Sequence, residues 1–361
     1  MKKISFFTLY LLLFQVFTTN AQVSYKFDKN EAMNLVAICN YWLNGKIENV
    51  DSTYIDSSYV LKYETKPNLL DNRWQLWENK QKNFAVINLR GTTRKDISWY
   101  ENFYAAMIPA EGEMTLPGNK TVHYKYAGDK RASVHVGWAV SIQMMLDSII
   151  WAINTENQKG IYNIYITGHS QGGALAHLLR AVLEYLPDSI VSHKNKYKVY
   201  AFAPPKPGNR FFAYDYASYT SLPVSSYSVI NISDWVPQVP FSVQSPDNMV
   251  EKNPFASLEN NDFKIPFLKR LVIKHVYFSM KRPIIRSQKR FEKYLGKKMK
   301  KEIEKKTGKF KTPDYSKDFA YFSVGLTIPL KPWKGNTDDE LMKIFWQHLP
   351  AHYYYLIEKQ L

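Results

Sequence analysis

Short runs of apolar residues alternate along the chain with longer segments whose apolar residues recur every three or four positions. Four runs have the length and boundaries of buried strands: FAVINL at 84–89, IYNIYITG at 161–168, KYKVYAFA at 196–203 and SVINIS at 228–233. Helical spacing is clearest in a set shared by one face: Ile142, Met145, Leu146, Ile149, Ile150 and Ile153. This alternation predicts an α/β protein with a mostly parallel central sheet and helices on both faces. In such sheets, ligands and chemistry gather at the carboxyl ends of the strands.

The first 22 residues, MKKISFFTLYLLLFQVFTTNAQ, have a different pattern. Two lysines precede an apolar run from Ile4 to Phe17, and small residues follow, which is the arrangement of a secretory signal peptide. The run is shorter than the roughly 20 residues of a spanning helix. We therefore predict that residues 1–21 are a signal peptide, that 22–361 form the mature domain, and that the protein is exported to the periplasm, the cell surface or the medium. The alternative is an uncleaved N-terminal anchor.

Composition limits the class of protein further. With 45% hydrophobic and 22% charged residues in 361, the chain is of globular type and long enough to bury a large core. Its single cysteine, Cys39, cannot form an intrachain disulfide, and its position on an apolar helical face favours burial over catalysis. Cysteines and histidines are not paired as in a zinc site.

The positive charge is concentrated in one stretch after Pro246. Residues 264–311 hold 18 Lys or Arg and three Glu, a net charge of +15, whereas the whole chain carries +16. We predict a basic, mainly helical insertion at about 247–312, with one apolar side: Phe291, Tyr294, Leu295, Met299 and Ile303. The pattern is typical of a helix that docks on anionic lipid, and the alternative is a solvated surface segment.

Ser170 lies in the stretch NIYITGHSQGGALAHLL, between a predicted strand and a helix rich in small residues. The Gly-x-Ser-x-Gly pattern suits a nucleophile because glycines leave room for a sharp, strained turn at the serine. The bare pattern occurs by chance in on the order of one chain in ten of this length, so its strand-turn-helix context matters more than its letters. A structural glycine turn is the alternative.

A serine nucleophile needs a base and an orienting acid, which follow it in the order Ser, Asp, His in such folds. Three histidines lie beyond VINISD, namely His275, His348 and His352, and His275 falls inside the basic stretch. Asp234 ends a predicted strand, which places its carboxylate at the expected catalytic edge. The residues alone leave His348 and His352 as candidates for the base.

Six segments in order resemble the class 3 lipase family, α/β-hydrolases typified by fungal triacylglycerol lipases. They are NLRGTT, VHVGW, ITGHSQGGALA, FAPPKPGN, VINISDWVPQVP and PAHYYYL. Ala203 replaces the glycine usual in the fourth segment. The resemblance covers roughly residues 84–240 and the C-terminal end, and it leaves out the first part of the mature chain and the basic insertion.

The resemblance implies an α/β-hydrolase fold and a set of site residues. Ser170 would be the nucleophile, Asp234 the acid and His352 the base, chosen over His348 by the closing Pro-x-His pattern. The backbone N–H groups of Thr92 and Gln171 would form the oxyanion hole, with the Thr92 hydroxyl as an extra donor. The family also has a lid helix after the oxyanion loop, which here corresponds to the segment around Trp99. The alternative for that segment is a fixed core helix.

The expected function is that of an exported serine hydrolase that cleaves carboxylic esters of lipids, through an acyl-enzyme and without metal or organic cofactor. Two enzymatic alternatives are a phospholipase A1 and a short-chain carboxylesterase. A third reading is a non-catalytic protein that binds anionic surfaces through the basic insertion. The signal peptide argues against a nucleic-acid partner, and the sequence carries no signal for an oligomeric state.

Overall fold

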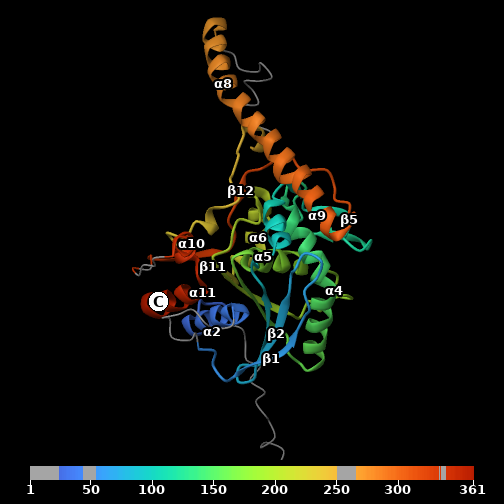
Figure 1. Ribbon diagram of the computed structural model, residues 1–361, viewed down its shortest axis with the longest axis vertical. Helices are drawn as coiled ribbons and strands as arrows, with labels where there is room; N and C mark the ends of the chain where they lie inside the picture. The colour runs from blue at the N-terminus through green and yellow to red at the C-terminus, as the bar shows by residue number, and fades with distance from the viewer. Residues whose placement is uncertain (1–23, 44–53, 250–265, 333, 335–338) are drawn as a thin grey trace, which may run out of the picture.

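The computed structural model describes residues 24–43, 54–249, 266–332, 334 and 339–361 (Figure 1). The predicted signal peptide, residues 1–21, and the first part of the basic insertion lie outside them. A seven-stranded sheet has the strand order β1-β2-β3-β8-β9-β11-β13. Its strands are β1 (Tyr59–Glu64), β2 (Trp74–Asn79), β3 (Phe84–Leu89), β8 (Asn163–His169), β9 (Lys196–Phe202), β11 (Ser226–Asn231) and β13 (Leu326–Leu330).

The central sheet is mostly parallel, as predicted. Strands β3, β8, β9, β11 and β13 pair in parallel, whereas β1 and β2 extend the sheet antiparallel beyond β3. The four runs predicted as strands form β3, β8, β9 and β11. Strands β1 and β2 escaped prediction because their stretch is rich in Tyr, Trp and Asn and lacks a clean alternation.

Six shorter strands form two small sheets beside the central one. A four-stranded sheet has the order β12-β10-β7-β4, and a hairpin pairs β5 with β6. These strands are β4 (Met107–Pro109), β5 (Glu111–Thr115), β6 (Thr121–Lys125), β7 (Ser133–His135), β10 (Gly208–Asn209) and β12 (Tyr321–Phe322).

Helices cover both faces of the central sheet. The α-helices are α2 (Lys29–Asn40), α3 (Asp96–Phe103), α4 (Val136–Gln158), α5 (Gln171–Glu184), α6 (Arg210–Thr220), α8 (Phe267–Phe291), α9 (Met299–Thr307), α10 (Glu340–Phe345) and α11 (Pro350–Gln360). Short 3-10 turns are η1 (Tyr41–Leu43), η2 (Val236–Gln238), η3 (Pro246–Asn248) and η5 (Trp346–His348), and η4 (Glu292–Lys298) is a π-helix.

Alternating side chains of each strand enter two separate cores. In β3, Ala85, Ile87 and Leu89 join the core under α4 and α5, whereas Phe84 and Val86 join the core under α2 and α11. Successive side chains of a strand point to opposite faces, so both faces of the central strands are buried. Figure 1 shows α4 on one side of the sheet and α2 with α11 on the other.

Within the described residues, α4 is the one helix long and apolar enough to span a membrane. Its most apolar window is 72% buried inside the protein. Ile142, Ile149 and Ile153 are fully buried in the core that it shares with α5. These contacts explain its apolarity as that of a core helix.

The basic insertion is helical, as expected, but it has two parts. Helix α8 projects from the body with its first residues at the far end and runs back toward it, where η4 and α9 follow (Figure 1). Phe291 and Ile303 are buried and Leu295 packs on the core, but Tyr294 is exposed. The Leu295 carbonyl accepts a hydrogen bond of 3.0 Å from the Ala106 N–H, so this end of the insertion is part of the fold.

A buried ion pair fastens α2 to the central sheet. Lys198 Nζ on β9 is fully buried and donates to Glu31 Oε2 at 2.7 Å, and also to the backbone carbonyls of Ser24 and Lys26. The hydroxyls of Tyr165 and Tyr200 donate to the Glu31 carboxylate at 3.0 Å each. These bonds compensate the desolvation of both charges, which would otherwise oppose folding.

Removing one partner of this pair should be far more damaging than removing an exposed lysine. We expect Lys198→Ala to lower the free energy of unfolding by about 3–5 kcal/mol, because Glu31 is left buried without its counter-ion. Lys82→Ala is the matched control, since Lys82 reaches the same carboxylate at 3.9 Å from an exposed position, and it should cost less than about 1 kcal/mol. Urea unfolding followed by circular dichroism measures both. Equal losses would contradict this account.

Candidate active site

Ser170 stands between β8 and α5 in a strained backbone conformation. Its φ is 61° and its ψ is −130°, a region that residues with a side chain rarely adopt. The Ser170 N–H donates to the Phe202 carbonyl at 2.9 Å, and its carbonyl accepts from Gly173 N–H at 2.8 Å. These bonds hold the turn, and the half-buried side chain projects at the carboxyl end of β8.

The two glycines of the turn allow a backbone approach that any side chain would block. A Cβ on Gly168 would lie 2.2 Å from the Gly172 carbonyl oxygen, and a Cβ on Gly172 would lie 2.2 Å from the Leu89 carbonyl oxygen. The glycines of the motif therefore serve the turn itself and its packing against the end of β3.

His348 and Asp234 lie in line with this serine. His348 Nε2 is 2.9 Å from Ser170 Oγ, and His348 Nδ1 is 2.7 Å from Asp234 Oδ2. A carboxylate can only accept, so Nδ1 carries the proton and Nε2 is left to accept from the serine hydroxyl. Ser170 and Asp234 are thus brought together as the sequence predicted, with a histidine between them.

The histidine is not the one predicted. His352 lies in the first turn of α11 and its Nδ1 is 2.5 Å from the Trp346 carbonyl oxygen, so the choice of His352 as the base was wrong. Leu349, with extended ψ of 133°, separates the short turn that ends at His348 from α11. This break sends the two histidines in different directions although they are four residues apart. The Pro-x-His pattern at Pro350 therefore selected the wrong one.

Tyr353 holds the Asp234 carboxylate in place, and the sequence did not predict this role. Its hydroxyl donates to Asp234 Oδ2 at 2.8 Å and accepts from the Asn231 N–H at 2.9 Å. The Val236 N–H donates to the other carboxylate oxygen of Asp234 at 2.9 Å. With His348, three donors hold a carboxylate that is almost fully buried. No sequence signal distinguishes Tyr353 from the two tyrosines that follow it.

The backbone N–H groups of Thr92 and Gln171 are available as donors. Neither makes a hydrogen bond to any residue in the described part of the chain. Gln171 begins α5, where the first N–H groups have no partner within the helix. A Cβ on Gly91 would lie 3.6 Å from Ser170 Cβ, which shows how closely the Thr92 loop approaches the serine. Both predicted oxyanion donors therefore lie in segments that meet at Ser170.

A chain of polar contacts holds the Thr92 hydroxyl. Asn102 Nδ2 donates to Thr92 Oγ1 at 2.8 Å, and Asn102 Oδ1 accepts from Trp138 Nε1 at 2.9 Å. Because Thr92 Oγ1 accepts here, its own proton remains available for an anion beside Ser170. Asn102 is a second site residue that the sequence did not reveal.

Two other histidines near the site are buried and neutral. Burial lowers the pKa of His135 to about 3, and its ring stacks on Trp138 while its Nε2 lies 3.1 Å from the Asn102 carbonyl oxygen. Burial, and then the proximity of His348, lower the pKa of His169, whose ring centroid is 4.5 Å from that of His348. Both therefore support the site by packing.

Glu101 is a fully buried acid that connects α3 to the nucleophile turn. Its Oε2 accepts from Asn72 Nδ2 at 2.8 Å, and Ser98, one turn earlier on α3, donates to Gln171 Oε1 at 3.3 Å. Burial raises the pKa of Glu101 to about 7, against the opposing effect of the polar side chains of Ser141, Asn72 and Gln171. These contacts make α3, which contains the predicted lid segment, a wall of the site. Movement of that segment stays a prediction.

Four partly exposed aromatic rings run outward from His348. Phe345 lies 6.3 Å from the His348 ring, and both Trp99 and Trp235 contact Phe345, at 6.4 and 5.6 Å between ring centroids. Phe103 stacks on Trp99 at 6.0 Å. We refer to Trp99, Phe103, Trp235 and Phe345 as the aromatic ridge. It offers an apolar surface that reaches His348 through Phe345.

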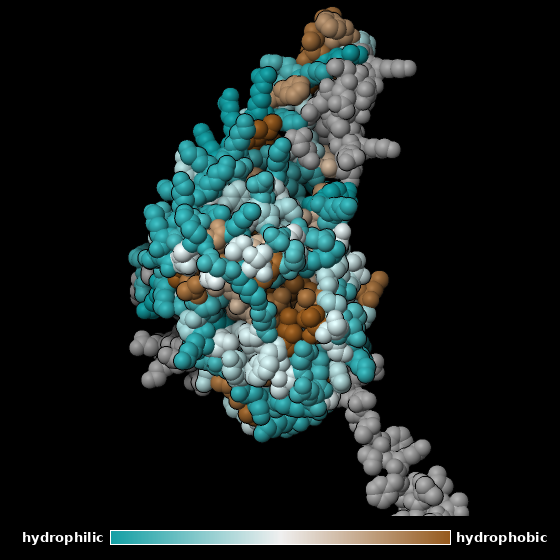
Figure 2. Space-filling model, turned by 90° about the vertical axis from the view of Figure 1, so that its right-hand side faces the viewer, coloured by the Kyte–Doolittle hydropathy of each residue, from teal (hydrophilic) through white to brown (hydrophobic). Residues whose placement is uncertain are grey.

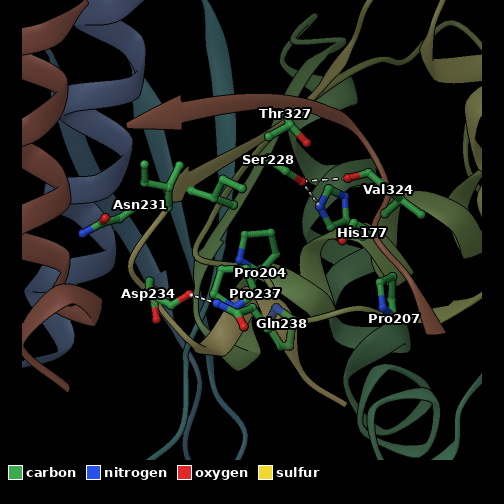
Figure 3. A pocket seen from close by; sticks show the side chains of 14 residues that line it. His177, Pro204, Pro207, Ser228, Asn231, Asp234, Pro237, Gln238, Val324 and Thr327 are labelled. Carbon is green, nitrogen blue, oxygen red and sulfur yellow. Dashed lines mark hydrogen bonds between the residues drawn. The ribbon is translucent and has the colours of Figure 1, made fainter. Parts of the chain in front are cut away.

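A cavity of about 130 Å³ borders Asp234 (Figure 3). Its walls include His177, Ser228 and Pro237 but neither Ser170 nor His348. Pockets that enclose drug-sized ligands measure roughly 300–1,000 Å³. The cavity is therefore too small for a lipid ester and lies away from the serine, so a substrate must approach Ser170 elsewhere.

A serine on a strand-to-helix turn, in line with a histidine and an aspartate on a mostly parallel sheet, defines an α/β-hydrolase. Residues 86–244 match the family model described as lipase (class 3). This match confirms the expected resemblance to the class 3 lipase family over those residues. His348 lies outside the matched residues.

Individual relatives are distant. The triacylglycerol lipase OBL1 of Arabidopsis thaliana is 27% identical over 188 residues, which are 45% of this chain and 35% of that protein, so this chain spans about a third of its length. The Rhizomucor miehei lipase in its propeptide complex aligns at 18% identity over 59% of this chain and 61% of that chain, with a TM-score of 0.40. Lipase II from Rhizopus niveus aligns at 18% identity over 59% and 72%, with a TM-score of 0.41.

The buried Glu101 predicts a pH dependence of stability. Its pKa rises from 4.5 in the unfolded chain to about 7 in the folded protein, so the folded state holds this proton more tightly. The free energy of unfolding should therefore fall as pH rises from 4.5 to about 7, by about 3 kcal/mol from this group. Glu101→Gln should remove this loss, as measured by urea unfolding at several pH values.

Glu111→Gln provides the control, because Glu111 is an exposed glutamate whose side chain keeps 58% of its accessible area. Its profile should match that of the wild type. If Glu101→Gln also keeps the full wild-type dependence, the acid is not protonated in the folded protein at neutral pH, and the account of its burial is wrong.

Proposed function

We propose that this protein hydrolyses carboxylic esters of lipids through an acyl-enzyme on Ser170. The observation that carries the proposal is the line of two hydrogen bonds from Ser170 Oγ through His348 to Asp234. A serine hydroxyl is a weak nucleophile until a neighbouring base takes its proton, and His348 is placed to do so.

In the proposed reaction, His348 Nε2 takes the Ser170 proton as Oγ attacks the ester carbonyl. Asp234, fixed by Tyr353, stabilises the imidazolium that forms and holds the ring in the required tautomer. The N–H groups of Thr92 and Gln171 stabilise the oxyanion. Each such donor lowers the activation barrier by roughly 3–4 kcal/mol, as judged by the effect of deleting one. His348 then returns the proton to the leaving alcohol, and water repeats the cycle on the acyl-enzyme.

The aromatic ridge supports a substrate with an apolar acyl chain. Its rings lie beside His348 and leave part of their surface exposed, as in Phe103, which is 50% exposed. Exposed apolar surface next to a reactive serine suits the acyl chain of an acyl glyceride better than a small polar ester. Phospholipids carry the same acyl chains, so a phospholipase A1 activity is the nearest alternative.

We also propose that the protein is exported and meets its substrate at a membrane surface. Export rests on the N-terminal signal sequence, residues 1–21, and predicts a periplasmic, cell-surface or secreted enzyme. Membrane contact rests on the basic insertion, where nearly all the excess positive charge lies.

The two C-terminal histidines provide a direct test of the assigned base. His348→Ala should lower kcat on p-nitrophenyl butyrate by about 10⁴-fold or more, because the serine loses its proton acceptor. Ser170→Ala should have a similar effect, because it removes the nucleophile. His352→Ala is the matched control and should lose less than about tenfold, since His352 Nδ1 faces the Trp346 carbonyl and His348, not His352, bonds Ser170 Oγ. Circular dichroism checks that each variant is folded. Loss of activity in His352→Ala with retention in His348→Ala would reverse the assignment.

The aromatic ridge predicts a selective effect on long acyl chains. Trp99→Ala should lower kcat/KM for emulsified p-nitrophenyl palmitate by about tenfold, and for the butyrate ester by less than about threefold, because a short chain makes fewer contacts with the ridge. Trp151→Ala, on the exposed side of α4, is the control and should leave both unchanged. A wild type that prefers butyrate would favour a short-chain esterase instead.

A further inference from the structure

Helix α8 begins with an exposed apolar face. Seven large apolar residues in its first half are each 45–74% exposed: Phe267, Leu268, Leu271, Val272, Ile273, Val276 and Met280. Leu268, Val272, Val276 and Met280 follow one another at four-residue spacing and so lie along one side of the helix. A soluble surface helix normally turns such a face toward a core.

The position of this face is equally unusual. Figure 1 shows α8 projecting from the body of the protein, with its first residues at the far end. Figure 2 shows hydrophobic side chains gathered at that same end, above a hydrophilic stem. We refer to Phe267–Met280 as the apolar tip. Within the described residues, Phe291 in the last turn of α8 packs on Phe319 in the core, whereas none of the seven exposed residues of the tip belongs to either core.

The stem below the tip is strongly basic. From 281 to 307 the chain has 12 Lys or Arg and three Glu, a net charge of +9. Within the described residues, eight of these side chains make no ion pair: Arg282, Arg286, Lys289, Arg290, Lys293, Lys298, Lys300 and Lys301. Two other lysines, Lys297 and Lys305, pair with Glu on the same segment. Much of the charge is therefore available to an anionic partner.

From these observations we propose that α8 is a membrane-docking arm. Its apolar tip enters the headgroup and acyl boundary of an anionic lipid bilayer, while its basic stem binds the lipid headgroups. An apolar end joined to a cationic stem matches the two layers of such a surface. A second copy of the chain is a poorer match, because pairing two arms would bring two stems of like charge together.

The proposal deepens the membrane contact proposed above and rests on it, but binding can be measured without hydrolysis. Its consequence is that the lipid surface is held by α8 while the ester is cleaved in the body of the protein. Loss of docking should then lower the rate of hydrolysis of aggregated substrates and leave the rate for soluble substrates unchanged. This separates the arm from the aromatic ridge, which contacts the site directly.

The test uses the full mature chain carrying Ser170→Ala, so that vesicle lipids are not consumed. It is sedimented with vesicles of phosphatidylcholine alone, or of phosphatidylcholine with phosphatidylglycerol. We expect binding to the anionic vesicles, weakened in about 0.5 M NaCl because salt screens the stem. The double variant Leu268→Asp and Val272→Asp should bind at least about tenfold more weakly, and Arg286→Glu with Lys289→Glu likewise.

Leu222→Asp is the matched control, because Leu222 is 92% exposed but lies outside the arm. It should bind like the parent. With Ser170 restored, the tip variant should hydrolyse p-nitrophenyl butyrate at the wild-type rate, which shows that it is folded. If that ester is not hydrolysed even by the wild type, the proposed function fails while the vesicle result still stands.

Two results would overturn the docking arm. One is absence of binding to anionic vesicles, or binding that the tip variant retains. The other is a parent protein that is dimeric by light scattering and ignores vesicles, with the tip variant monomeric, which would assign the face to a second copy of the chain.

Discussion

Ser170 keeps a φ of 61° because three stretches of backbone meet there without side chains between them. Gly168 closes on Gly172, and Gly172 closes on the Leu89 carbonyl at the end of β3. Strain of this kind costs about 1–3 kcal/mol and persists only when the surroundings enforce it. The same approach that strains the serine brings the Thr92 loop beside it. The turn and the oxyanion donors are therefore one structural feature.

The other half of the site comes from distant parts of the chain. Asp234 follows β11, and His348 comes from a short turn before the last helix. Tyr353 on that helix returns to Asp234, so α11 positions the base and the acid together. Helix α11 also packs on α2, which the buried Lys198 and Glu31 fasten to β9. The core under α2 and α11 therefore stabilises the half of the site that contains His348 and Asp234.

The sequence predicted those features that depend on local chemistry. Short apolar runs such as Phe84–Leu89 became parallel strands because their side chains must be buried on both faces. Ser170 was recognisable from its glycines, and Asp234 from its place at the end of a strand. His348 was not recognisable, because the direction of a side chain just before a helix break at Leu349 depends on backbone angles. Asn102, Glu101 and Tyr353 act through contacts with residues far away in sequence, and no local pattern predicts these.

The basic insertion shows the same division between local pattern and tertiary contact. Its positive charge and its helical structure could be predicted from the sequence. Nothing in the spacing of apolar residues indicated that η4 and α9 pack on the body whereas α8 projects from it. The hydrogen bond that the Leu295 carbonyl accepts and the burial of Ile303 hold η4 and α9 on the body. As a result, one stretch of uniform composition divides into a structural part and a projecting arm.

The central claim is that Ser170 is an activated nucleophile. The most direct measurement is reaction of the folded protein with a fluorophosphonate, followed by mass spectrometry of the peptides. We expect one adduct, on Ser170, in the native protein. It should not form after unfolding in urea, because activation of the serine depends on His348 and the strained turn. A folded protein whose Ser170 stays unmodified, or an adduct on another serine, would contradict it.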